Sequence, residues 1–166
     1  MRRVAFGLGA NLGDRVAALQ GAVDLIAPRL TAATVSSVYE TAPVGGPEQP
    51  DYANAVLVGD TDDEPHALLA LAHEAEQAAH RTRDVRWGPR TLDVDVLVVG
   101  GLTSDDPALT LPHPRAHERA FVLVPWVEAD PDATLPDGRR VLDLRDSLAG
   151  SADVRRRDDV ALEIRA

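Results

Sequence analysis

The chain of 166 residues carries 17 basic and 27 acidic side chains, has a net charge of −10, and is 45% hydrophobic. These values are typical of a single globular domain over residues 1–166, and they argue against general nucleic-acid binding, which needs a basic surface. Cysteine and lysine are both absent, which excludes disulfides, thiolate metal sites and lysine nucleophiles, so arginine, backbone amides or a metal ion would have to bind any phosphate group.

The N-terminal part of the chain predicts a strand followed by a helix. Residues 3–8 form a short apolar run, and the turn at 9–14 is expected to cap the helix. The apolar run of about five residues is too short for the core of a signal peptide, and no stretch reaches the roughly 18 apolar residues of a membrane span. We therefore expect a cytoplasmic protein. The apolar face of the helix recurs at helical spacing and comprises Val16, Leu19, Val23, Ile26 and Leu30.

The middle of the chain predicts two strands, a second helix and a further strand. Residues 34–40 and 52–59 are rich in strand-forming side chains and flank a loop at 41–51 that is full of Pro and Gly. A helix is expected to begin at Pro65, and residues 93–99 form the most strand-like run of the sequence. The buried face of this second helix comprises Leu68, Leu71, Ala72, Ala75 and Ala79.

The order of the predicted elements, β-α-β-β-α-β, indicates an α+β fold. It matches a ferredoxin-like sandwich, an antiparallel sheet covered on one face by two helices, with extra C-terminal elements. Further short elements are expected at 121–129 and 141–149. The charged tail at 151–166 leaves two alternatives open, an edge strand or a frayed end.

The sequence Asp93-Val94-Asp95 is the sharpest chemical feature. Side chains alternate along a strand, so both carboxylates are expected on one face with Leu97 and Val99, and their Cα atoms about 6.5–7 Å apart. Val94, Val96 and Val98 are expected on the other face. Two acids in this arrangement suit Mg²⁺, which prefers oxygen ligands and shares its coordination with substrate phosphates. The alternative is a pair of solvated acids at the start of a strand.

A group of arginines precedes these acids and surrounds Trp87. In an acidic protein, such a group beside two carboxylates predicts a triphosphate site, in which the acids hold metal and the guanidinium groups bind phosphate. A solvated, salt-bridged loop is the alternative. The group consists of Arg81, Arg83, Arg86 and Arg90, and a second cationic segment at 113–119 precedes Phe121.

The loop at 41–51 and the strand after it predict a small-molecule site. Tyr52 offers a flat aromatic face and Asn54 offers both a donor and an acceptor, which suits a heterocycle with amide-like edges. They lie two residues apart and so share a face of the strand. Ordinary strand packing beside a hairpin loop is the alternative.

Four sequence blocks together resemble the 6-hydroxymethyl-7,8-dihydropterin pyrophosphokinase family of folate biosynthesis. They occur in the order of the family, over about the first 140 residues. Three departures are His80, where the family usually has glycine, His73, where the family often has glutamine or a similar residue, and Ala10, where serine is common. The blocks are residues 9–14 (GANLGD), 39–54 (YETAPVGGPEQPDYAN), 86–95 (RWGPRTLDVD) and 111–123 (LPHPRAHERAFVL).

This resemblance implies a role for each matching residue. Asp93 and Asp95 are implied to hold two Mg²⁺ ions between ATP, the co-substrate, and the hydroxymethyl oxygen of the pterin. The implied catalytic residues are these two aspartates with Arg81 and Arg90. The implied ATP-binding residues are His73, Glu76, Arg83, Trp87, Val96, Thr110, His113 and Arg119. The implied pterin-binding residues are Thr41, Pro43, Val44, Gly45, Tyr52, Asn54 and Phe121.

The expected reaction converts ATP and the pterin alcohol into AMP and the pterin diphosphate, catalysed by a monomer without nucleic-acid or membrane partners. One alternative is a non-catalytic nucleotide-binding regulatory module on the same fold, which does not explain Tyr52 and Asn54. An RNA-binding sheet would need basic charge and stacked aromatics, whereas the chain has six aromatic residues and is acidic. A metal-dependent glycosyltransferase also uses Asp-x-Asp, but it usually needs a larger domain.

Overall fold

The computed structural model describes residues 1–11, 14–41, 52–81, 92–148 and 154–165. Predictions that fall on residues 42–51 and 82–91 therefore lie outside the described residues. In chain order the elements are β1 (Arg2–Ala10), α1 (Arg15–Ile26), η1 (Ala27–Arg29), β2 (Thr31–Val35), β3 (Val38–Thr41), β4 (Tyr52–Thr61), α2 (Pro65–Arg81), β5 (Asp93–Val99), β6 (Ser104–Asp106), β7 (Leu109–Leu111), η2 (Ala116–Glu118), α3 (Ala120–Ala129), α4 (Val141–Ser147) and β8 (Arg155–Arg157).

A central antiparallel sheet carries the fold. Its strands follow the order β5-β1-β4-β3-β8, and β2 also pairs with β4. β4 is long enough to pair with β1 along its whole length on one side and with β2 and β3 in succession on the other. The predicted ferredoxin-like α+β fold is confirmed, with the hairpin of β6 and β7 as a small addition.

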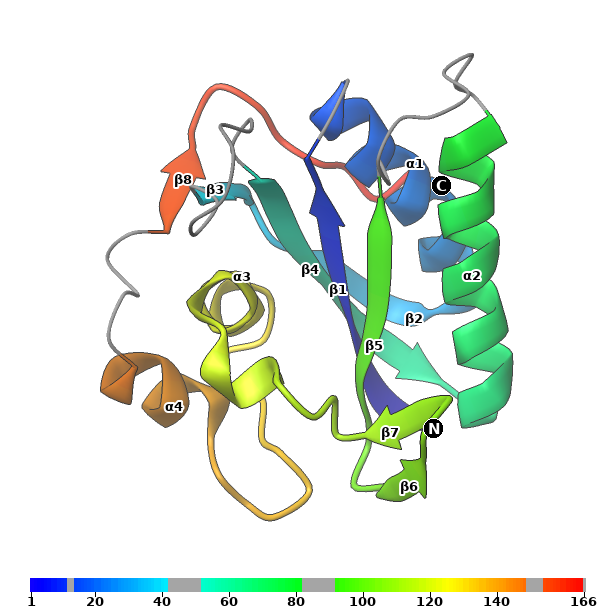
Figure 1. Ribbon diagram of the computed structural model, residues 1–166, viewed down its shortest axis with the longest axis vertical. Helices are drawn as coiled ribbons and strands as arrows, with labels where there is room; N and C mark the ends of the chain where they lie inside the picture. Colours follow the sequence, from blue (N-terminus) through cyan, green and yellow to red (C-terminus); the bar gives the residue numbers. More distant parts are fainter. Residues whose placement is uncertain (12–13, 42–51, 82–91, 149–153, 166) are drawn as a thin grey trace.

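Helices cover both faces of this sheet (Figure 1). α1 and α2 lie on one face, where Leu19, Val23 and Leu68 pack into a first core cluster. α3 and α4 lie on the other face, where Leu123 and Trp126 pack into a second cluster. The prediction of one covered face was therefore incomplete. β4 buries side chains on both of its faces, and each apolar face must be removed from water.

Two predicted elements are interrupted or end earlier in the structure than the sequence pattern predicts. α1 stops at Ile26, and Pro28 lies in the short 3₁₀ turn that follows, so Leu30 is not part of the helix. The predicted strand 34–40 is split into β2 and β3. At the break, Ser36 accepts a hydrogen bond from the Val56 N–H through its hydroxyl (2.9 Å) and donates its own N–H to the Val56 carbonyl (2.9 Å).

β5 contains an irregularity that changes which side chains face which layer. Phe6 pairs with Val96 and Ala5 with Val98, so the register between β1 and β5 skips Leu97. Leu97 and Val98 consequently both pack into the second cluster, and Val99 returns to the first. The predicted alternation holds from Asp93 to Leu97 and was wrong for Val98 and Val99.

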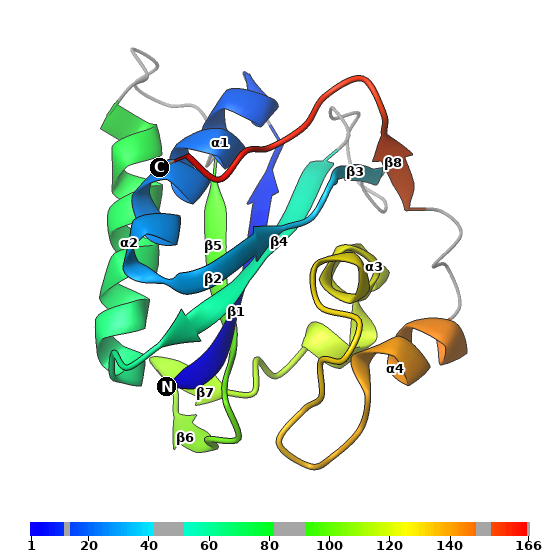
Figure 2. The same cartoon turned by 180° about the vertical axis from the view of Figure 1, so that it is seen from behind.

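The C-terminal tail forms an edge strand, one of the two alternatives left open by the sequence. β8 pairs with β3, and the chain then runs back toward α1 (Figure 2). The predicted elements at 121–129 and 141–149 are α3 and α4. Within the described ranges, none of the helices combines the length and apolar character that crossing a membrane requires.

Candidate active site

Asp93 and Asp95 lie at the start of β5 and share the face of the sheet that α3 also covers. Asp93 pairs with Gly9 and Asp95 with Gly7. Val94 between them packs into the first cluster on the opposite face, so the two carboxylates point away from it. Asp93 is exposed, and the side chain of Asp95 is 46% exposed. The geometry predicted for the Asp-x-Asp sequence is therefore present, and both acids are open to solvent and ligands.

Gly9 of β1 lies between Asp93 and Asn54. It pairs with Asp93 on one side and with Asn54 of β4 on the other, so all three belong to one row across the sheet. Adjacent strands are about 4.8 Å apart, which places the backbones of Asn54 and Asp93 about 10 Å apart. A Cβ atom on Gly9 would lie 3.2 Å from Asn54 Oδ1. The glycine thus keeps the surface between the amide and the carboxylate free of a side chain of its own.

The residues predicted to bind a heterocycle come together on this same face. Asn54 is only 5% exposed, and its Nδ2 donates a hydrogen bond to Thr41 Oγ1 (3.2 Å). Thr41 pairs in register with Tyr52, which is partly buried. Phe121 lies in the first turn of α3 and packs against the second cluster, and the guanidinium of Arg119 lies 5.7 Å from the centre of its ring.

Glu76 of α2 connects the second helix to the strand that carries the two acids. Its Oε2 accepts a hydrogen bond from the backbone N–H of Val94 (2.9 Å). β5 is the terminal strand on its side of the described sheet, so this N–H points away from β1. The Glu76 carboxylate thus satisfies a backbone donor midway between Asp93 and Asp95.

His113 reaches the acids because the segment after β7 returns along β5. Its backbone N–H donates to the carbonyl of Leu97 (2.8 Å), the residue that the β1 register skips. Its Nε2 lies 3.9 Å from Asp95 Oδ1. Burial lowers the pKa of His113 below its ordinary value, and Arg119 and Arg115 act in the same direction, although the Asp95 charge opposes them. A neutral imidazole at pH 7 therefore lies beside Asp95.

Three other predicted ATP-binding residues differ in their burial and hydrogen bonding. Thr110 of β7 donates its hydroxyl to the Asp106 carbonyl (3.1 Å). The side chain of Val96 is buried in the first cluster, so only its backbone is available on the side of the acids. His73 is exposed on α2. The predicted residues Pro43, Val44, Gly45, Arg83, Trp87 and Arg90 lie outside the described residues, as does the side chain of Arg81.

Gly7 and Gly9 were not among the predicted site residues. They pair with Asp95 and Asp93 and add no side chain of their own to this face. Beside Gly7 the space is taken by the Leu97 side chain, whose Cδ2 would lie 3.3 Å from an added Cβ, and beside Gly9 the nearest group is the Asn54 amide oxygen, at 3.2 Å. The signal was available, since two glycines two residues apart inside an apolar strand indicate a place where a ligand or another backbone approaches closely.

The donor set of the site fits Mg²⁺ bound together with a substrate. No group of three or more His, Asp or Glu side chains that could hold a metal ion occurs within the part of the chain that the structure describes. Mg²⁺ is usually bound through one or two carboxylates, with water and substrate phosphates as its other ligands. Asp93 and Asp95 provide two such carboxylates.

Comparison with known proteins identifies the family. Residues 5–131 match the sequence model described as 7,8-dihydro-6-hydroxymethylpterin-pyrophosphokinase (HPPK). The chain belongs to this family. The resemblance found from the sequence is thereby confirmed, and the protein is an enzyme, a pyrophosphokinase of the HPPK family.

Relatives in several bacteria are named 2-amino-4-hydroxy-6-hydroxymethyldihydropteridine pyrophosphokinase. One from Mycobacterium tuberculosis is 46% identical over 145 residues, which is 81% of this chain and 76% of the relative. One from Pseudomonas aeruginosa is 40% identical over 146 residues, 87% of this chain and 90% of the relative. One from Bacillus subtilis is 42% identical over 131 residues, 77% of this chain and 78% of the relative.

Solved HPPK structures share the fold at low sequence identity. The wild-type HPPK-DHPS protein of Plasmodium falciparum matches with a TM-score of 0.68 and 14% identity, over 87% of this chain and 44% of that chain. An HPPK-DHPS structure in complex with substrates matches with a TM-score of 0.69 and 13% identity, over 88% of this chain and 43% of that chain. The chain thus spans less than half the length of these solved chains, and the likeness concerns the fold.

Proposed function

We propose that the chain transfers the diphosphate group of ATP to the hydroxymethyl group of 6-hydroxymethyl-7,8-dihydropterin. The observation that carries this proposal is the row Asn54–Gly9–Asp93, which places a buried amide beside a pair of exposed acids in a member of the HPPK family. The amide suits the edge of a pterin, and the acids suit the metal-bound triphosphate.

In the proposed reaction the hydroxyl oxygen of the pterin attacks the β-phosphorus of ATP. A new bond forms between this oxygen and the β-phosphorus, and the bond from the β-phosphorus to the oxygen bridging it to the α-phosphate breaks. That oxygen leaves on AMP with the bonding electron pair, and the hydroxyl proton passes to solvent or to the carboxylate of Asp95. Catalysis of this type depends on positioning and charge stabilisation.

The pterin is proposed to bind on the β3 and β4 side of the row. Asn54 and Thr41, already hydrogen-bonded to each other, would bind the polar edge of the ring. Tyr52 and Phe121 would enclose its faces, since both lie on the side of the sheet covered by α3. The backbone of Pro43, Val44 and Gly45 is proposed to complete this subsite.

ATP is proposed to bind on the β5 side, with Asp93 and Asp95 holding two Mg²⁺ ions. When bound, these ions neutralise phosphate charge and orient the triphosphate toward the alcohol. His113 lies next to Asp95, and Glu76 fixes the strand between the acids. The other proposed ATP-side residues are His73, Arg81, Arg83, Trp87, Arg90, Val96, Thr110 and Arg119. The monomeric state and the cytoplasmic location stay predictions from the sequence.

The test is AMP release from ATP by the purified protein. We expect AMP only when Mg²⁺ and 6-hydroxymethyl-7,8-dihydropterin are both present, with the pterin gaining one diphosphate group by mass spectrometry. 6-Methyl-7,8-dihydropterin, which lacks the attacking hydroxyl, is the matched control and should give no AMP. ATP binding without any AMP release would support a non-catalytic nucleotide-binding module instead, and ADP as the product would exclude diphosphate transfer.

A further inference from the structure

The C-terminal strap, residues 154–165, crosses from the edge of the sheet to the first helix. It begins with β8, which pairs with β3 through Arg157 opposite Val38 and Arg155 opposite Glu40. It then passes to α1, where Leu162 is buried in the first cluster. Both ends of the strap are therefore attached to the folded core (Figures 1 and 2).

The far end of the strap is fastened to α1 by backbone and side-chain contacts. The side-chain amide of Gln20 donates to the Glu163 carbonyl (2.8 Å), and its oxygen accepts from the Glu163 N–H (2.9 Å). Arg165 pairs with Asp24 (3.2 Å). These contacts involve α1 alone, so they supply a comparison for the contacts that the strap makes with β3.

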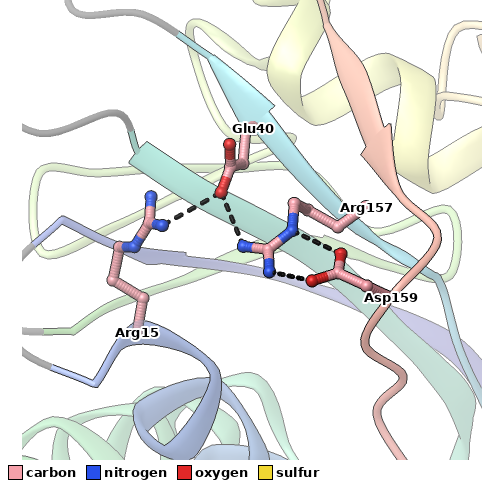
Figure 3. A network of polar contacts seen from close by, with 4 residues as sticks. All are labelled: Arg15, Glu40, Arg157 and Asp159. Carbon is pink, nitrogen blue, oxygen red and sulfur yellow. Dashed lines mark hydrogen bonds and ion pairs between the residues drawn. The ribbon is translucent and has the colours of Figure 1, made fainter.

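At β3 the strap takes part in a charged network centred on Glu40 (Figure 3). Glu40 Oε1 accepts from Arg157 Nη1 (2.7 Å) and from Arg15 Nη2 (2.9 Å), and Arg157 Nε also donates to Asp159 (2.7 Å). The Glu40 side chain is 17% exposed and that of Arg157 is 27% exposed. Two cations thus converge on a largely buried carboxylate, an arrangement less screened by solvent than a surface ion pair.

Glu40 lies one residue from the proposed pterin subsite. The next residue, Thr41, accepts the hydrogen bond from Asn54. Because side chains alternate along a strand, Glu40 and Thr41 project from opposite faces of β3. β3 is short and pairs with β4 through only Tyr39, Glu40 and Thr41. The network therefore anchors β3 on the face that carries Glu40, opposite the face on which Thr41 contacts Asn54.

We propose that the C-terminal strap positions the pterin subsite, with Arg157 acting through Glu40 to keep Thr41 and Asn54 in their hydrogen-bonded arrangement. The proposal rests on the function proposed above. The strap lies beyond the family match, which ends at residue 131, so this role is assigned from the contacts of this chain. Arg157 and Glu40 are positioning residues, since neither is placed against substrate.

The test compares Arg157→Gln with Arg165→Gln in the full chain. Each variant removes one arginine of the strap. The side chain of Arg157 pairs with Glu40 of β3, whereas that of Arg165 pairs with Asp24 of α1. We expect Arg157→Gln to raise the KM for the pterin about fivefold while the KM for ATP and kcat stay within about twofold. Arg165→Gln should leave all three values unchanged. Arg157→Lys should recover part of the pterin KM, because an ammonium group can keep a single contact with Glu40.

The melting temperature of each variant is measured as well, so that an effect on the pterin KM can be distinguished from a loss of stability. If Arg157→Gln does not fold, Glu40→Gln tests the same contact and should show the same selective rise in the pterin KM. An unchanged pterin KM, or an equal rise in both KM values, would overturn the strap proposal. If the wild-type protein released no AMP, the proposed function would be overturned instead. The strap proposal would then be tested by measuring pterin binding through the fluorescence of the pterin. An equal Kd for wild type and Arg157→Gln would reject the strap proposal.

Discussion

The Glu76 carboxylate on α2 accepts the backbone N–H of Val94 on β5 at 2.9 Å, between the two aspartates of the site. α2 thereby fixes the strand that presents the acids, in addition to covering the first core cluster. This contact gives Glu76 a role that does not require it to touch ATP.

Replacing Glu76 by Ala should loosen the strand that carries the acids. The Val94 N–H would lose its charged acceptor, which should lower the free energy of unfolding by about 1 kcal/mol in urea titrations. The concentration of Mg²⁺ needed for half-maximal AMP release should rise as well. Glu74→Ala, at an exposed position on the same helix, is the matched control. If both variants needed the same Mg²⁺ concentration, the strand-fixing role would be rejected.

Replacing Asp95 by Asn should remove turnover and leave the fold intact. The amide keeps the shape of the side chain but loses the negative charge that a metal ion requires, so we expect AMP release to fall by about a thousandfold or more. The side chain is 46% exposed, so the melting temperature should change little. Asp105→Asn, on the β6–β7 hairpin, is the control. Near-normal turnover by Asp95→Asn would contradict the metal role.

Replacing Gly9 by Ala should weaken pterin binding. The new Cβ would lie 3.2 Å from Asn54 Oδ1, so the amide would have to move by a few tenths of an ångström. We expect the KM for the pterin to rise severalfold, measured by AMP release. Gly21→Ala is the control, since its Cβ meets nothing within 4 Å. In the middle of α1 that change should stabilise the protein by about 0.5–1 kcal/mol and leave both KM values unaltered.

Replacing Glu40 by Gln should reduce stability in a pH-dependent way. Burial raises the pKa of Glu40, but the hydrogen bond from Arg157 and the charge of Arg15 outweigh it, so the pKa lies below its ordinary value of 4.5. A carboxyl whose pKa is lower in the folded state stabilises that state above the unfolded pKa, and this contribution is lost as the pH falls. The difference in unfolding free energy between wild type and Glu40→Gln should be largest near pH 7 and should shrink below pH 4.5. A difference that stayed constant from pH 7 to pH 3 would show that the charge of Glu40 does not contribute.

Several features of the fold could be predicted because they depend on short stretches of chain. The helical spacing of Leu19, Val23 and Ile26 predicted α1, and the alternation at Asp93 and Asp95 predicted their common face. The second covered face could also have been inferred. The almost uninterrupted apolar run at 52–59 is typical of a strand buried on both sides, and the segment 120–129 is apolar apart from Glu128.

Other features depended on partners that the local sequence does not reveal. The register that skips Leu97 arises from how β5 meets β1, and it reversed the predicted faces of Val98 and Val99. The split at Ser36 and Ser37 likewise depends on a distant group, since Glu128 of α3 accepts hydrogen bonds from the Ser37 N–H (2.8 Å) and hydroxyl (2.6 Å). Neither the β1–β5 register nor the Ser37–Glu128 contact could be predicted from the residues of one segment alone.

The sequence by itself determined the helical and strand periodicities, the common face of the two acids and membership of a pyrophosphokinase family, because each is encoded within a contiguous segment. The tertiary structure alone decided that Gly9 lies between Asn54 and Asp93, that the Glu76 carboxylate accepts the Val94 N–H, and that the C-terminal strap pairs with Glu40. Arg157 and Glu40 are 117 residues apart in the chain, and only the folded sheet, by bringing β8 beside β3, makes their charges neighbours.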